Sequence, residues 1–287
     1  MHFSAEHVLK ECRDKEISIS SFFRDLEAEQ ASMTGEALDE QMLQILSVMQ
    51  ESAERALEKP TYSLSGMTGG DASKAWEHRR KNTLLGEFVM GSVARALSTS
   101  EVNASMGKIV AAPTAGASGI LPAALFGAKE RLQLTMEELL PGLYTAGAIG
   151  KIVAQEATIS GADGGCQAEC GTAAAMSAAG LTELFGGTPE ACFHAASFAL
   201  IHVLGLVSDP IAGFVEFPCS LRNASGLVNA FVSADMACAG IESLVPFDEV
   251  VEAMHKVGKA MPEALRETAL GGIAATPTAK KCEKKFL

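Results

Sequence analysis

Apolar residues recur at intervals of three and four along most of the chain. After Thr34 one apolar stripe runs to about Leu57, just before Pro60, and consists of Leu38, Met42, Ile45, Leu46, Met49 and Ala53. A repeat of about 3.6 residues predicts a helix with one buried face, and threonine is a favoured N-cap. Residues 188–190 read Thr-Pro-Glu, which places a cap, a proline and an acid in the order that begins a helix.

The same periodicity predicts further helices over roughly residues 82–97, 136–157, 166–184, 189–207, 221–239 and 247–265. Strand signals are weak, because no alternation of β-branched or aromatic residues is sustained between turns. The pattern therefore predicts an all-α protein.

Small residues are concentrated in the middle of the chain. In segment 161–180, twelve of twenty residues are Ala or Gly, and five of these are glycines that weaken a helix interior. Small side chains let helices approach closely, so we expect a buried Ala/Gly-rich bundle here. We expect a single compact helical domain over 1–287, with peripheral helices in 1–60, the core that carries the candidate site in 61–240, and a C-terminal helix and tail in 241–287.

Charge and cysteine content narrow the class of protein. The 287 residues contain 23 Lys and Arg against 35 Asp and Glu, a net charge of −12 that disfavours nucleic-acid binding. Two stretches have no charged residue. Prolines interrupt the first, 109–128, and the second, 191–208, is short for a membrane-spanning helix, so we expect both to be buried core segments. Residues 1–10 lack a secretory apolar region, and an odd number of seven cysteines favours the reducing cytoplasm.

Polar, glycine-containing loops are candidates for ligand binding. Segments 65–71, 113–119 and 161–170 each precede a helical pattern, where backbone N–H groups and the helix dipole favour an anion such as a carboxylate. Ordinary turns remain the alternative. The candidate substrate-binding residues are Ser65, Thr68, Gly69, Gly70, Asp71, Thr114, Gly116, Ala117, Ser118 and Gly119.

The cysteines differ in their surroundings. Cys166 and Cys219 stand where a loop meets a helix, whereas Cys192 and Cys238 lie in apolar helical contexts typical of core thiols. The three-residue gap between Cys166 and Cys170 places both sulfurs on one helix face, which alone is a weak metal signal. Four acids, Glu156, Asp163, Glu169 and Glu216, lie among apolar residues, where each could serve as a base or as a buried hydrogen-bond partner.

Long motifs in four segments resemble the α-chain family of iron–sulfur-dependent L-serine dehydratases. The segments are 61–74, 108–125, 159–184 and 205–223, and they include Ala-Pro-Thr-Ala-Gly-Ala-Ser-Gly-Ile-Leu-Pro-Ala, Gly-Gly-Cys-Gln-Ala-Glu and Asp-Pro-Ile-Ala-Gly-Phe-Val-Glu-Phe-Pro-Cys. The resemblance implies a helical domain in which three cysteines hold a [4Fe–4S] cluster, with one iron open as a Lewis acid. It further implies elimination of the L-serine hydroxyl to give aminoacrylate, and then pyruvate and ammonia.

This chain departs from the family pattern at the implied ligands. Those positions fall at Cys166, Ser208 and Cys219, and the middle position is cysteine in the family. Conversely, Cys170 stands where the family motif has valine. Cys170 could replace the missing thiolate, Ser208 could ligate through oxygen, or the cluster could be weak or absent; we favour the first.

The resemblance leaves two other functions open. A related lyase could act on L-cysteine as a desulfidase, since the leaving group differs only in oxygen or sulfur. A non-catalytic subunit without a cluster is the third alternative, because of Ser208. The family also implies a separate β chain as partner, and so a heteromeric complex.

Overall fold

The computed structural model describes residues 3–285, so residues 1 and 287, the limits of the predicted domain, lie outside it. The internal division of that domain stays a prediction.

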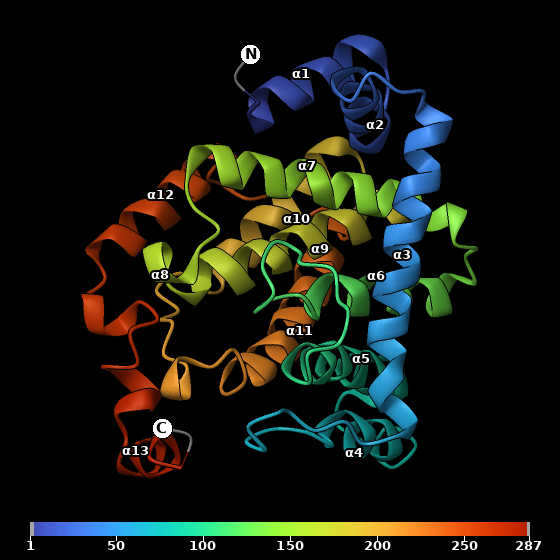
Figure 1. The fold of residues 1–287 in the computed structure, drawn as a ribbon. Coiled ribbons are helices and arrows are strands. Elements are labelled where there is room, and N and C mark those ends of the chain that lie inside the picture. The colour runs from blue at the N-terminus through green and yellow to red at the C-terminus, as the bar shows by residue number, and fades with distance from the viewer. Residues whose placement is uncertain (1–2, 286–287) are drawn as a thin grey trace.

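The helices are α1 (Ala5–Lys15), α2 (Ile19–Gln30), α3 (Gly35–Glu58), α4 (Asp71–His78), α5 (Gly86–Ala104), α6 (Ile120–Leu132), α7 (Leu140–Glu156), α8 (Gly161–Gly164), α9 (Thr172–Leu184), α10 (Pro189–Ile201), α11 (Cys219–Cys238), α12 (Phe247–Ala260) and α13 (Pro277–Glu283) (Figure 1). Residues 3–285 form no β-strand, only two isolated bridges. The predicted all-α class is confirmed.

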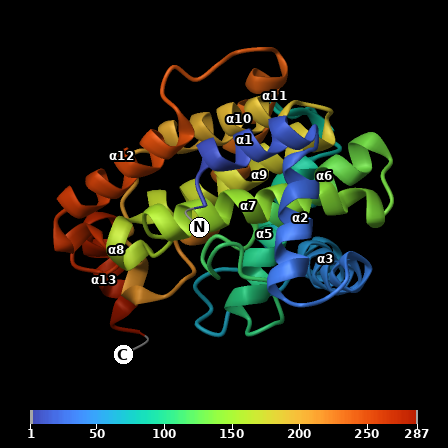
Figure 2. The ribbon, with the colours of Figure 1, turned by 90° about the horizontal axis from the view of Figure 1, so that it is seen from above.

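Helix α9 is the centre of the core. Every residue from Thr172 to Thr182 is buried, and Figure 2 shows α9 between α7 and α10. Small residues permit this packing: a Cβ added at Gly180 would lie 2.5 Å from the carbonyl oxygen of Gly142 in α7. The part of the Ala/Gly-rich segment that lies in α9 is therefore buried, and its small residues let the backbones of neighbouring helices approach closely.

Several predicted helix boundaries are confirmed. Thr34 caps α3 by accepting a hydrogen bond from Ala37 N at 3.2 Å, and Thr188 caps α10 in the same way. Other boundaries differ: α5 spans Gly86–Ala104 where 82–97 was predicted, and α12 ends at Ala260, not near 265. Helix α10 ends at Ile201, not near 207, because the chain turns back through Gly205, whose φ is +87°. The helix predicted from 166 begins as a π-helical turn, Gln167–Gly171, before α9.

The uncharged segments are buried mainly where they are helical, whereas Ala111 and Ala115 in the first segment and Leu204 in the second are exposed. In α6, residues 120–128 are all buried, and most of α10 is buried as well. Among the described residues, no helix combines the length and apolarity needed to cross a membrane.

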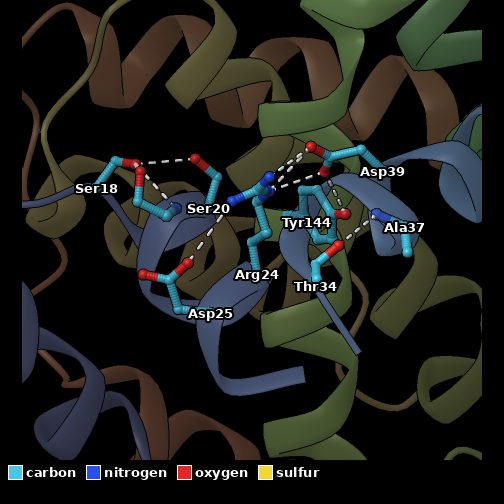
Figure 3. Close-up of polar contacts among 9 residues, drawn as sticks. Ser18, Ser20, Arg24, Asp25, Thr34, Ala37, Asp39 and Tyr144 are labelled. Carbon is cyan, nitrogen blue, oxygen red and sulfur yellow. Dashed lines mark hydrogen bonds and ion pairs between the residues drawn. The ribbon is translucent and has the colours of Figure 1, made fainter. Parts of the chain in front are cut away.

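A polar cluster joins α2, α3 and α7 at the edge of the core (Figure 3). Arg24 of α2 donates to both carboxylate oxygens of Asp39 in α3, at 2.8 Å from Nε and 2.6 Å from Nη2. The buried Tyr144 of α7 donates its hydroxyl to the same carboxylate at 2.7 Å. The Arg24 guanidinium lowers the pKa of Asp39, so the ionised carboxylate is the form that ties the three helices together.

We expect Asp39→Asn to lower the free energy of unfolding by about 2 kcal/mol at neutral pH, because two charge-assisted contacts lose their acceptor charge. The pKa of Asp39 is lowered in the folded state, so this stabilisation is present above its ordinary pKa and disappears as pH falls through the lowered value. Urea unfolding at several pH values measures the difference. The exposed neighbour Glu40→Gln is the control, and an equal effect of both variants would contradict the role of Asp39.

Candidate thiol-rich active site

Cys166 and Ser208 meet because two loops are joined next to them. Gly165 has φ +76°, and a Cβ there would lie 2.8 Å from Leu206 O, so this close approach requires glycine. Gln167 N donates to Leu206 O at 3.0 Å and its side chain accepts from Gly205 N at 2.9 Å. As a result Cys166 Sγ lies 3.6 Å from Ser208 Oγ.

Arg222 holds the Cys166 sulfur. Its Nη1 lies 3.4 Å from Cys166 Sγ, and its Nη2 donates to Asp209 Oδ1 at 2.6 Å. The pKa of Cys166 is lowered, first by a hydrogen bond from the Cys170 thiol and then by the charge of Arg222, despite burial. Cys166 is therefore the thiol at this site whose thiolate the protein stabilises, and thiolates are the form that binds metals.

The implied ligand Cys219 and its candidate companion Cys170 differ in their surroundings. Cys170 packs with Ala117 and Ile120 in a small apolar cluster, and burial and its hydrogen bond to Cys166 raise its pKa. Burial, followed by the negative charge of Cys166, raises the pKa of Cys219 to about 12. The Cys166 thiol thus interacts with the thiols of Cys170 and Cys219 and with the Ser208 hydroxyl.

The types of donor at this site fit a metal that prefers sulfur. Within residues 3–285, however, no group of three or more His, Cys, Asp or Glu side chains is arranged to hold a metal ion. Of the remaining thiols, Cys192 is buried as predicted, whereas the prediction that Cys238 is a core thiol is wrong. Cys238 is the last residue of α11, where the helix reaches the surface.

A C-terminal strap, residues 263–276, is bound to the Ser208–Asp209 segment. Ser208 N donates to Leu265 O at 2.9 Å and Ser208 O accepts from Glu267 N at 2.7 Å. Asp209 Oδ2 accepts from Ile273 N at 2.6 Å. Asp209 therefore joins the strap to Arg222, and nothing in the local sequence pattern indicates this contact.

The loop before α4 carries the first set of predicted substrate-binding residues. Its hydroxyl groups point to another segment: Ser65 Oγ and Thr68 Oγ1 lie 2.7 and 3.2 Å from Glu216 Oε2. Asp71 N donates to the buried Glu101 at 2.6 Å, and the Asp71 carboxylate pairs with Lys74. Of the other two residues of this set, Gly70 donates its N–H to Thr61 O at 3.0 Å, and Gly69 lies opposite Tyr62 in an isolated bridge.

One buried side chain makes two hydrogen bonds to the backbone of the second predicted loop, residues 113–119. Asn223 of α11 accepts from Gly119 N at 2.8 Å and donates to Gly116 O at 2.7 Å and to Cys219 O at 2.9 Å. Ser118 turns its hydroxyl back to Ala115 O. The N–H groups of Gly116 and Ala117 have no hydrogen-bond partner in the described chain. Gly116 is half-buried, whereas Ala117 is fully buried.

Glu169 faces the same loop. Its Oε1 accepts from Thr114 Oγ1 at 2.8 Å. Burial, followed by the charge of Cys166, raises its pKa to about 7, and Glu267 adds further repulsion. Asp163, another predicted acid, lies instead at an exposed position near Lys259.

Cavities elsewhere do not include these residues. One of about 480 Å³ lies between the start of α1 and α12, and one of about 340 Å³ lies between α1, α2 and α7. Neither contains a predicted site residue, so the site is defined by its chemical groups and not by these cavities.

Sequence reasoning missed Arg222, Asn223 and Asp209. All three follow or fall within the quoted motif 209–219. A signal was present: Arg222 is the single basic residue between 209 and 238, one helical turn after Cys219. A lone charge in an apolar helix indicates a buried partner.

We expect Asn223→Ala to lower the free energy of unfolding by about 3 kcal/mol, because buried partners in the 113–119 loop and at Cys219 lose their hydrogen bonds. Chemical denaturation measures the loss. Ser225→Ala, at an exposed position of the same helix, is the matched control. A loss below about 0.5 kcal/mol for Asn223→Ala would contradict the role of this side chain as the link between loop and helix.

Comparison with known proteins gives a consistent result. The family model described as serine dehydratase alpha chain matches residues 14–274. The chain is 47% identical over 285 residues to "L-serine dehydratase, alpha chain" of Peptoniphilus asaccharolyticus, covering 99% of this chain and 98% of that one. It is 48% identical over 287 residues to "Probable L-serine dehydratase, alpha chain" of Bacillus subtilis, covering 100% and 95%.

A third relative is longer than this chain. "L-serine dehydratase TdcG" of Escherichia coli is 46% identical over 181 residues, which are 62% of this chain and 40% of that protein. The resemblance expected from the motifs is confirmed, and it extends over nearly the whole sequence. The chain belongs to the serine dehydratase alpha chain family.

Proposed function

We propose that this protein is the α subunit of an L-serine ammonia-lyase that acts in the cytoplasm and converts L-serine to pyruvate and ammonia. The observation that carries the proposal is the full-length match to α chains named L-serine dehydratase. The thiol-rich site supports it, since Cys166 and Cys219 lie in the motifs that resemble the family and Cys166 interacts electrostatically with both Cys170 and Cys219.

We further propose that Cys166, Cys170 and Cys219 hold a [4Fe–4S] cluster, with Ser208 beside it. The cluster would supply a Lewis acid for departure of the substrate hydroxyl. Two features support this assignment: the Cys166 thiolate is stabilised by Arg222, and Cys170 donates a hydrogen bond to it. Thiolate is a softer ligand for iron than an alkoxide, which favours Cys170 over Ser208 as the third ligand.

The loop 113–119 is proposed to bind the substrate carboxylate. The N–H groups of Gly116 and Ala117 lack partners in the described residues, and backbone N–H groups before a helix favour an anion. Asn223 keeps this loop next to Cys219. Substrate binding by the other predicted residues, Gly69, Gly70, Asp71, Thr114, Ser118 and Gly119, stays a prediction, since several of their polar groups are bonded within the protein.

Anaerobic assembly with iron and sulfide tests the cluster. We expect wild-type protein to bind iron and acid-labile sulfide and to show broad visible absorption, and we expect Cys170→Ala to lose most of this iron. Cys238→Ala removes an exposed thiol away from the site and should retain it. Full iron content in Cys170→Ala would exclude Cys170 as a ligand, and no iron in wild-type protein would favour the non-catalytic alternative.

A partner chain is tested by activity. The α-chain relatives match this protein end to end, whereas the Escherichia coli relative carries additional sequence in one chain. We therefore expect isolated α chain to form little pyruvate from L-serine and the complex with a β chain to restore turnover. Full turnover by the isolated chain would contradict the need for a partner, and a preference for L-cysteine would favour the desulfidase.

A further inference from the structure

Glu216 is a buried residue, and only one of its two carboxylate oxygens accepts hydrogen bonds from the described residues of the protein. Its residue is 8% exposed, and Oε2 accepts hydrogen bonds from Ser65 and Thr68. Its Oε1 has no hydrogen-bond partner, and no Lys, Arg or His pairs with the carboxylate, within residues 3–285. Oε1 is not among the fully buried side-chain atoms of the described chain that lack a partner, so this oxygen is open to solvent. An ionised carboxylate oxygen that is open to solvent is suited to a charge-assisted hydrogen bond from a cation supplied from outside the chain.

The surrounding charge also favours a cation. The carboxylates of Glu169 and Glu267 lie close together, because a Cβ built on Gly161 would be 2.6 Å from Glu169 Oε2 and 3.0 Å from Glu267 Oε2. The guanidinium at this site, Arg222, is already shared between Asp209 and Cys166. The region is therefore negative and attracts positively charged groups.

Glu216 also lies next to the proposed carboxylate-binding loop. Its neighbour Val215 has a methyl carbon 3.2 Å from the position of a Cβ built on Gly116, and Glu169 Oε1 lies 3.5 Å from the same position. Gly116 is thus in contact with Val215, the residue before Glu216 in the chain. An α-amino acid carries its carboxylate and its ammonium group on one carbon, so neighbouring sites for an anion and a cation match its shape.

We propose that Glu216 binds the ammonium group of the amino-acid substrate through Oε1, and that Ser65 and Thr68 act as positioning residues that hold this carboxylate. The inference rests on the proposed lyase function and deepens it. In this arrangement the Ser65 and Thr68 hydroxyls do not contact the substrate carboxylate, which lies at Gly116 and Ala117. A charge-assisted hydrogen bond between ammonium and carboxylate then selects amino acids over hydroxy acids that lack nitrogen.

The test compares two ligands on the anaerobically assembled α–β complex. L-serine has the ammonium group, and 3-hydroxypropanoate has the carboxylate and hydroxyl without it. We expect Glu216→Gln to raise KM for L-serine about tenfold or more, because one charge-assisted contact is lost. The inhibition constant of 3-hydroxypropanoate should stay the same or fall, because a negative charge near its carboxylate is removed.

The controls separate this role from a structural one. Glu242→Gln alters an exposed acid and should change neither constant. Should Glu216→Gln fail to fold, Thr68→Val removes one of the two supporting hydroxyls and should raise KM for L-serine to a smaller extent, again without weakening the inhibitor. If Glu216→Gln raises KM for L-serine and the inhibition constant of 3-hydroxypropanoate equally, the role of Glu216 is refuted and the lyase function is not affected. If the wild-type complex releases no pyruvate from L-serine, this inference and the lyase function are both refuted.

Discussion

The shared guanidinium of Arg222 is the interaction on which the candidate site depends. One side of it contacts Cys166 Sγ and the other donates to Asp209, which in turn holds Ile273 of the C-terminal strap. A buried ion pair of this kind adds little net stability, since removing charges from water costs free energy. Its consequence is positional: three segments far apart in the sequence are fixed around one thiolate.

The packing of the core makes that arrangement attainable. The small residues of α9 let α7 and α10 pack closely, and the π-helical turn Gln167–Gly171 connects this buried helix to Cys166. π-helical turns often occur at functional sites because they shift side chains relative to a regular helix. Asn223 then links the N-terminal end of α11 to the loop 113–119. A rigid helical core and a few buried polar side chains thus hold the loops that carry the chemistry.

Much of the helical structure could be predicted from the sequence, because caps and apolar periodicity depend on neighbouring residues. The Thr34 and Thr188 caps and the apolar stripe of α3 were readable because they depend on residues within a few positions. The π-helical turn, the early end of α10 and the strap were not readable, because each depends on contacts with distant segments, such as Gly205 with Gln167. The motifs indicated which loops matter, but not that Glu216 takes the hydroxyls of Ser65 and Thr68.

This chain has serine at 208, where the family pattern has cysteine, and cysteine at 170, where it has valine. The central claim is therefore that iron is bound by sulfur from Cys166, Cys170 and Cys219. Iron-edge X-ray absorption of the anaerobically assembled α–β complex tests it most directly, by comparing wild-type protein with Ser208→Ala. The account predicts a first shell dominated by sulfur that is the same in both proteins. A shell in which the Ser208→Ala change removes an oxygen ligand, or one made mainly of oxygen and nitrogen, would contradict it.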